Sequence, residues 1–186
     1  MKFTKLAAAV TLALAVSAAN AATETKTFNV KINITATCAA NVFSGATVDD
    51  VDFGSVASNA ANPVLTASNG NTNTLTVQCT NGSVFNVGLK PASATAGAST
   101  GAGSMVNGAN TIAYQLKKPT FAAGAYTAGT AASANWGDQA GSTELGVTGQ
   151  GLTTPIKLPV AAVIQANTLN VPAGAYTEQV LATLTY

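Results

Sequence analysis

The chain has 186 residues, of which 47% are hydrophobic and 8% charged, with eight Lys, seven acidic residues, no Arg and no His. A nearly neutral chain without guanidinium groups is a poor binder of a nucleic-acid backbone. Without His, neither a Ser-His-Asp nor a Cys-His set can be assembled, so we predict a protein that is not an enzyme and needs no cofactor.

The first residues have the pattern of a secretory signal peptide. Lys2 and Lys5 precede an apolar run over residues 6–16 that is too short for a membrane span. Ala19-Asn20-Ala21 supplies the small residues of a cleavage site, so we predict a signal peptide over residues 1–21. The remaining 165 residues are enough for one exported domain, and they hold six basic and seven acidic side chains. We predict no membrane insertion of the mature chain.

Residues 28–38, FNVKINITATC, follow the predicted cleavage site and alternate strictly between apolar and polar side chains. This period of two is typical of a strand that buries one face. One face carries Phe28, Val30, Ile32 and Ile34, and the other carries Asn29, Lys31, Asn33 and Thr35. Because a terminal strand can be lent to a neighbouring molecule, we interpret residues 22–37 as a donor-strand segment and residues 38–186 as the domain.

The two cysteines, Cys38 and Cys79, each end a strand-like run. Export places them in an oxidising compartment, where two thiols allow one pairing, so we predict a structural disulfide between them. A metal site would need further ligands, and a catalytic cysteine would need an imidazole.

Residues 48–53 form a short run that ends at Gly54 and contains Asp49, Asp50 and Asp52. The three carboxylates could hold a calcium ion, but the further ligands, central Gly and closing Glu of an EF-hand loop are missing. We therefore expect a solvated turn here.

Further strands are predicted over residues 74–79 and 84–89, and the turn dipeptide Asn81-Gly82 between them indicates a hairpin. Residues 111–118 place Ile112, Tyr114 and Leu116 on one face. Another strand is expected within residues 155–164. About seven short strands separated by turns favour an antiparallel β-sandwich.

The last strand is predicted over residues 176–186, after a turn at residues 172–174. Its alternation places these side chains on one face: Tyr176, Val180, Ala182, Leu184 and Tyr186.

Two stretches, residues 91–110 and 121–149, are rich in Ala, Gly, Ser and Thr, and we interpret them as long loops or ragged edge strands. Trp136 lies in the second stretch. It could stack on a sugar, but a partly buried aromatic at the base of a loop is the favoured interpretation.

In this order and spacing, the motifs resemble a subunit of archaic chaperone–usher pili of the spore coat protein U family. The resemblance covers essentially the whole predicted mature chain, with Glu178 as a departure where the family pattern has Asp. The motifs that carry it are the alternating segment ending in Cys38, Val51-Asp52-Phe53-Gly54, Leu75-Thr76-Val77-Gln78-Cys79, Ile112-Ala113-Tyr114, Trp136-Gly137-Asp138, Pro155-Ile156, Gly174-Ala175-Tyr176 and the closing strand with Tyr186.

The resemblance implies an incomplete immunoglobulin-like sandwich whose missing strand is supplied by a neighbouring subunit. Phe28, Val30, Ile32 and Ile34 would be the donor face. The groove and the edge that pairs with a periplasmic chaperone would be formed by Val180, Ala182, Leu184 and Tyr186. The expected function is a structural pilus subunit, secreted through an outer-membrane usher, polymerising with identical or related pilins and supporting attachment and biofilm formation. The alternative is a self-contained secreted β-sandwich that binds carbohydrate, in which residues 28–34 would pair within their own chain.

Overall fold

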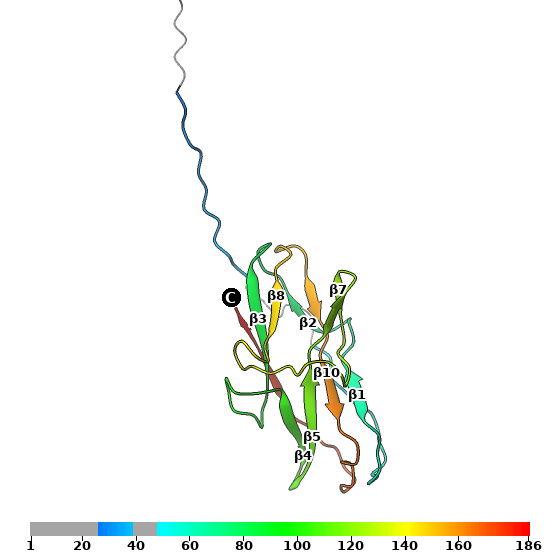
Figure 1. The fold of residues 1–186 in the computed structure, drawn as a ribbon. Helices are drawn as coiled ribbons and strands as arrows, with labels where there is room; N and C mark the ends of the chain where they lie inside the picture. Colours follow the sequence, from blue (N-terminus) through cyan, green and yellow to red (C-terminus); the bar gives the residue numbers. More distant parts are fainter. Residues whose placement is uncertain (1–25, 39–47) are drawn as a thin grey trace, which may run out of the picture. The chain divides into compact units, whose positions relative to one another are not determined.

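The computed structural model describes residues 26–38 and 48–186 (Figure 1). The predicted signal peptide lies outside the described residues. The chain divides into two units, Met1–Ile34 and Thr35–Tyr186. Residues 26–34, the described part of the first unit, form neither helix nor strand.

The described part of the second unit consists of antiparallel strands and contains no helix. One sheet has the order β1 (Leu65–Ser68), β10 (Ala161–Ile164), β5 (Asn110–Lys117) and β4 (Ala102–Asn107). A second has the order β11 (Val180–Thr185), β3 (Val84–Pro91) and β8 (Leu145–Thr148). Two smaller pairs are β2 (Leu75–Val77) with β9 (Ile156–Leu158), and β6 (Thr120–Ala122) with β7 (Ala125–Thr127). This architecture confirms the prediction of an all-β, sandwich-like fold.

The core lies where the alternating side chains of these strands meet. In β5, Ile112, Tyr114 and Leu116 are buried, as their spacing predicts. In β3, Phe85, Val87 and Leu89 occupy the inward positions of an eight-residue strand. Figure 1 shows β3 and β8 side by side, with β5, β10 and β1 of the other sheet nearby.

The predicted hairpin between residues 74–79 and 84–89 is wrong, although both strands exist. Gly82 has a φ of +77°, and the Ser83 amide donates to the Thr80 carbonyl at 3.0 Å, so the turn itself forms. It carries the chain from β2, which pairs with β9, to β3, which pairs with β8 and β11. A turn dipeptide reports local chain reversal and does not identify the strand's partner.

The strand expected within residues 155–164 is two strands. Pro159, which is fully buried and cannot donate a ladder hydrogen bond, lies between β9 and β10. The two then pair in different sheets.

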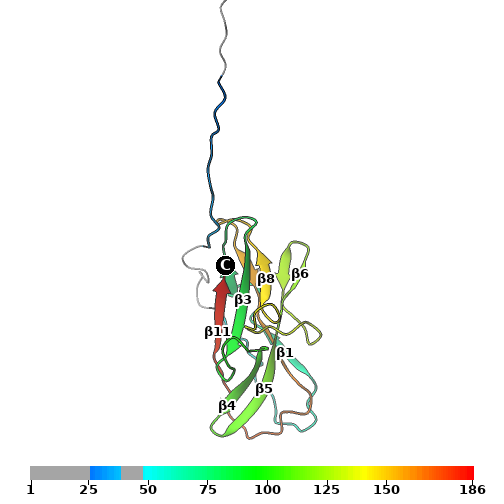
Figure 2. The ribbon, with the colours of Figure 1, turned by 60° about the vertical axis from the view of Figure 1, so that its left-hand side comes forward.

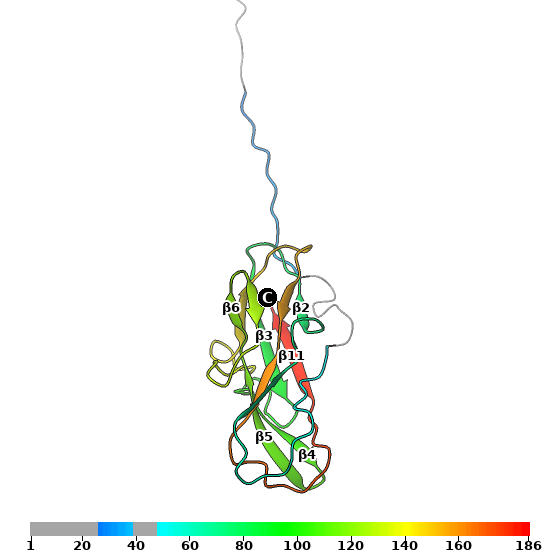
Figure 3. The same ribbon diagram turned by 90° about the vertical axis from the view of Figure 1, so that its right-hand side faces the viewer.

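The final strand begins later than predicted, at Val180. Before it, Thr177 forms an isolated bridge with Val106 of β4. The end of the chain therefore contacts the first sheet before it joins the second. Figure 2 shows β11 beside β3, and Figure 3 shows the β4–β5 hairpin at the end of the body below β11.

The stretches rich in Ala and Gly contain more regular structure than expected. β4 lies in the first, and β7 and β8 lie in the second. β4 and β8 are edge strands of their sheets, as one of the two predicted interpretations allows. Gly103 in β4 faces the Tyr114 ring and the Glu178 carboxylate so closely that an added Cβ would collide with both, which explains one of these small residues.

The predicted disulfide is present. Cys38 and Cys79 are bonded with an S–S distance of 2.04 Å, and both are buried. The adjacent Thr80 amide donates to the Thr37 carbonyl at 2.8 Å. This disulfide closes a loop that spans 41 residues.

Candidate functional site

β11 is hydrogen-bonded along one edge only, to β3, among the described residues. Ala182 and Leu184 lie opposite Leu89 and Val87, which are buried, so they belong to the inner face of the sheet. Yet both are only partly buried, and Val180 on the same face is 40% exposed. The strand therefore combines an open backbone edge with a half-covered apolar face.

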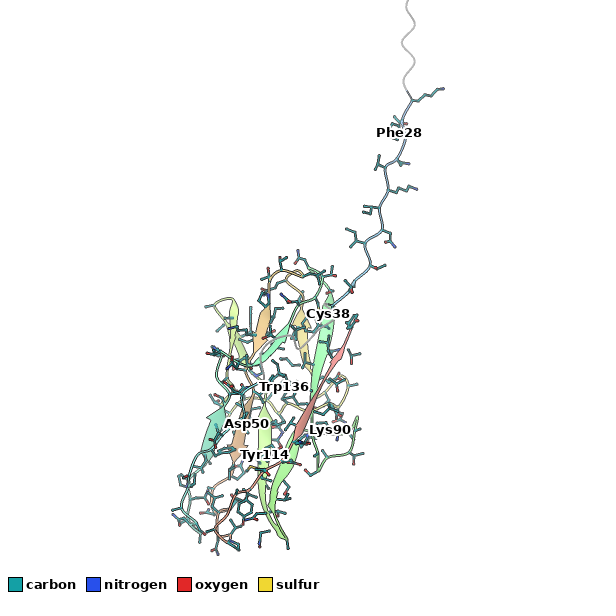
Figure 4. All side chains as sticks on the ribbon, turned by 180° about the vertical axis from the view of Figure 1, so that it is seen from behind. Phe28, Cys38, Asp50, Lys90, Tyr114 and Trp136 are labelled. Carbon is teal, nitrogen blue, oxygen red and sulfur yellow. A yellow bond between two sulfur atoms is a disulfide. The ribbon has the colours of Figure 1, made fainter. Side chains whose placement is uncertain are left out.

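A cavity of about 750 Å³ lies beside this strand. One wall is the segment 176–182, and the opposite wall is the segment 48–53. Core side chains form much of the apolar lining: Leu75, Leu89, Leu116, Val160 and Ala162. Figure 4 labels three of the lining residues, Asp50, Tyr114 and Lys90, at the same level of the body. We refer to this cavity and its two walls as the groove.

In the second wall, residues 48–53, partly buried and exposed side chains alternate as in a β-strand, but the segment belongs to no sheet of the described residues. Val51 and Phe53 are partly buried and pack against the core, whereas Asp50 and Asp52 between and beside them are exposed. The Asp49 amide donates to the Asn73 carbonyl at 2.8 Å, and the Asp49 carboxylate accepts from Asn73 Nδ2 at 3.1 Å. No described residue forms a β-ladder with residues 48–53. Apart from the Asp49–Asn73 hydrogen bond and the pairing of β11 with β3, the described residues give the two walls no further backbone partner strand.

Glu178 joins three elements at one end of the groove. Its Oε1 accepts from the Ser93 amide and its Oε2 accepts from the Ser104 amide, both at 2.7 Å. Burial, and then the hydrogen bond and negative charge of Glu178, raise the pKa of the Tyr114 hydroxyl well above its ordinary value. The hydroxyl therefore stays neutral at physiological pH and can donate to the carboxylate.

Asn69 is a polar group within the groove lining that is itself only 8% exposed. Its Oδ1 accepts from the Val160 amide at 2.9 Å and from Thr74 Oγ1 at 3.2 Å. Its Nδ2 is buried and has no hydrogen-bond partner among the described residues. An unpaired buried donor is costly, so Asn69 is a polar group that destabilises this part of the core unless its donor gains a partner.

The predicted donor-face side chains are all highly exposed. Phe28, Val30, Ile32 and Ile34 have exposed fractions between 74% and 89%, and no β-ladder of the described residues includes them. The segment therefore presents four apolar side chains on one edge of an unpaired chain.

The predicted groove residues divide into two pairs. Val180 and Ala182 line the cavity. Leu184 packs partly against the core beyond the cavity lining, and Tyr186 is 66% exposed. The wall formed by residues 48–53 was not predicted, although the alternation of Val51 and Phe53 before Gly54 was a usable signal.

Trp136 is more buried than the sequence suggests. It has no exposed surface, and its Nε1 donates to the Val87 carbonyl at 2.8 Å. A sugar cannot stack on this ring, so its role is to support β3.

Two of the three carboxylates in residues 48–53 have separate local partners. Asp49 binds Asn73, and Asp52 Oδ1 accepts from the Gly54 amide at 2.8 Å. Within residues 26–38 and 48–186, they do not form a group that could hold a metal ion. The same residues include no helix with the length and apolar character of a membrane span.

A family model of the Spore Coat Protein U domain matches residues 24–183. This range includes the donor-face residues, the disulfide and both walls of the groove. No curated protein matches the chain.

Proposed function

The chain belongs to the Spore Coat Protein U family, and from this premise we propose that it is a structural pilus subunit that polymerises by donor-strand exchange. In this proposal the leading segment of one subunit fills the groove of the next. The observation that carries it is the groove itself, a cavity lined by core side chains between β11 and residues 48–53, in a chain whose leading segment exposes an apolar face.

The geometry of the groove supports a strand as the occupant. An inserted strand could pair with β11 on one side and with residues 48–53 on the other, because neither forms a further β-ladder among the described residues. Its alternate side chains would enter the apolar lining. The inserted strand would thereby satisfy backbone groups and cover the half-exposed face of β11 in one step.

Strand insertion would bury a large apolar surface. Burying Phe28, Val30, Ile32 and Ile34 contributes about 1.5–3 kcal/mol each, or about 6–12 kcal/mol in all as an upper bound. Each new backbone hydrogen bond adds on the order of 1 kcal/mol. The sum is comparable to the whole stability of a typical domain.

The exposed apolar surface of the groove also explains why the subunit would need a chaperone and an usher. An unfilled groove with an open edge strand is an aggregation hazard. We propose that a periplasmic chaperone covers the β11 edge in transit, that the exchange takes place at an outer-membrane usher, and that the polymer is a surface fimbrium. Attachment and biofilm formation would be the roles of that fibre.

The test is the substitution Ile32→Asp, because a buried, unpaired carboxylate in the groove would oppose strand insertion. Cells making this variant should export the chain but carry no fibres in electron micrographs. Asn33→Asp is the matched control, since it adds the same charge to the outward face, and it should leave fibres visible. Abundant fibres from Ile32→Asp would refute the proposal.

A further inference from the structure

Most of the charged side chains that line the groove are carboxylates, and most of these carboxylates already accept hydrogen bonds. Asp49 binds Asn73, Asp52 caps the Gly54 amide, and Glu178 accepts from two amides. Asp50 is exposed and makes no hydrogen bond with any described residue. One cation, Lys90, lines the same cavity. Asp50 is therefore the carboxylate on the second wall that has no hydrogen-bond partner among the described residues.

The leading segment carries the opposite charge. Residues 26–37 contain Lys26 and Lys31 and no acidic residue. Lys31 shares a face with Asn29 and Asn33, whereas Lys26 falls in step with the apolar face of Phe28. Lys31 is thus the single cation on the polar face, at its centre.

The alternation of both segments places these two charges on the same side of the sheet. When the apolar face of the incoming strand enters the groove, Lys31 points outward. On the neighbouring wall Val51 and Phe53 point toward the core, so Asp50 and Asp52 point outward as well. Side chains that share a face of adjacent strands are directly or diagonally in contact, and opposite charges there are stabilising.

We propose that Lys31 of one subunit lies beside Asp50 of the next, with Asp52 as its diagonal neighbour, and that this pair fixes the register of the intermolecular strand. The inference rests on the donor-strand function proposed above. The apolar face alone excludes slips of one residue, because such a slip turns every side chain to the other face.

The charge pair would act against shifts of the inserted strand by two residues relative to the groove. Such shifts keep Val30 and Ile32 facing inward and would be distinguished only weakly by apolar side chains of similar size. A slip of two in either direction replaces Lys31 beside Asp50 with Asn29 or Asn33. A slip that moves Lys31 beside Val48 loses the direct pair, and the opposite slip places Lys31 beside Asp52, whose Oδ1 already accepts a hydrogen bond from the Gly54 amide. The register with Lys31 beside Asp50 therefore pairs it directly with the carboxylate that has no hydrogen bond among the described residues.

A charge-swap cycle within one chain tests the pair. Fibres of Lys31→Glu and of Asp50→Lys should each dissociate in urea about two- to fivefold faster than wild-type fibres, as expected for one cross-strand ion pair. Fibres of the combined variant should dissociate at nearly the wild-type rate, because the pair is restored with its signs exchanged. Lys26→Glu makes the same change of charge outside the polar face and should have no such effect. A combined variant that dissociates as fast as the product of the two single effects would overturn the inference.

Engineered disulfides measure the register directly, even if the charge variants assemble poorly. Cysteines at positions 31 and 50 of one chain should join successive subunits into a ladder on non-reducing gels, because adjacent cross-strand positions are within disulfide range. Cysteine pairs at 29 and 50, or at 33 and 50, should cross-link at least several-fold less. Fibres in which one of these shifted pairs dominates would refute the register and leave the polymerisation proposal intact. Chains that form neither fibres nor cross-links in any variant, the wild type included, would refute both.

Discussion

Two strands flank β3 in the same sheet, and their inner faces differ. On one side, β8 buries Leu145 and Val147, which are 9% and 4% exposed. On the other side, β11 leaves Val180 40% exposed, and Ala182 and Leu184 are only partly covered. Both strands form regular ladders with β3. Backbone pairing is therefore not what separates the closed side of the sheet from the open side.

The difference lies in what covers each strand. Trp136 donates from its ring to β3 with no exposed surface, so the centre of the sheet is sealed. Beside β11 the corresponding space is the groove of about 750 Å³. Among the described residues, the sheet keeps its buried core on one side of β3 and leaves a partly exposed apolar strip along β11 on the other. This combination suits a subunit that must fold before it assembles.

Replacing Trp136 with Ala is the strongest way to break the closed side. We expect a loss of about 3–5 kcal/mol in the free energy of unfolding, since a fully buried indole is removed. The Val87 carbonyl also loses its donor, which adds to the cost. Urea unfolding of the exported chain would measure it. Phe121→Ala is the aromatic control, because that ring is 55% exposed, and it should cost much less. Similar losses for both variants would contradict the assignment of Trp136 to the sealed centre.

Removing the disulfide tests the open side, because the loop that it closes carries the second wall of the groove. For a loop of this length, the chain-entropy model gives about 3–4 kcal/mol for the paired substitution of Cys38 and Cys79 by Ser. The expected result is a lower urea midpoint. Wild-type chain reduced with dithiothreitol should match the double variant. A reduced chain as stable as the oxidised one would show that the disulfide does not stabilise the fold.

The sequence predicts those features that depend on one segment alone. The alternation over residues 111–118 identifies the buried face of β5, and two thiols in an exported chain identify the disulfide. Pairing depends on distant segments, so the hairpin after β2 was predicted wrongly, and the break at Pro159 separates strands of different sheets.

The site was predicted in part for the same reason. The alternation of the last strand identifies Val180 and Ala182, which line the groove. Residues 48–53 became a wall only through their position in the fold. The burial of Trp136 likewise depends on β3, which lies far from it in the sequence.

A matched pair of Val→Ala substitutions compares the two sides with the same chemistry. Val87→Ala in β3 removes fully buried methyl groups and should cost about 1.5–3 kcal/mol in the unfolding of the lone chain. Val180→Ala, at a 40% exposed position, should cost less than about 1 kcal/mol. In fibres, the effect of Val180→Ala on resistance to urea should increase, since in the proposed fibre the incoming strand would cover that side chain. Equal costs at the two positions in the lone chain would mean that the β11 side is already closed.

The smallest effect concerns pH at the end of the groove, where Tyr114 meets Glu178. The pKa of the Tyr114 hydroxyl is raised in the folded chain, first by burial and then by the neighbouring carboxylate. Below about pH 10 the hydroxyl is neutral in both the folded and the unfolded chain, so its contribution to stability does not change with pH. Above that pH the unfolded chain loses this proton while the folded chain keeps it, so stability falls as pH rises, by at most about 1.4 kcal/mol per pH unit. The variant Tyr114→Phe should lack the part of the fall in stability with rising pH that comes from this hydroxyl. The two proteins differ only in this hydroxyl, so the difference between their urea midpoints from pH 8 to pH 10.5 isolates Tyr114. If the urea midpoints of the two proteins changed with pH in parallel, the Tyr114 hydroxyl would have the same pKa in the folded and unfolded chains, and the prediction would be wrong.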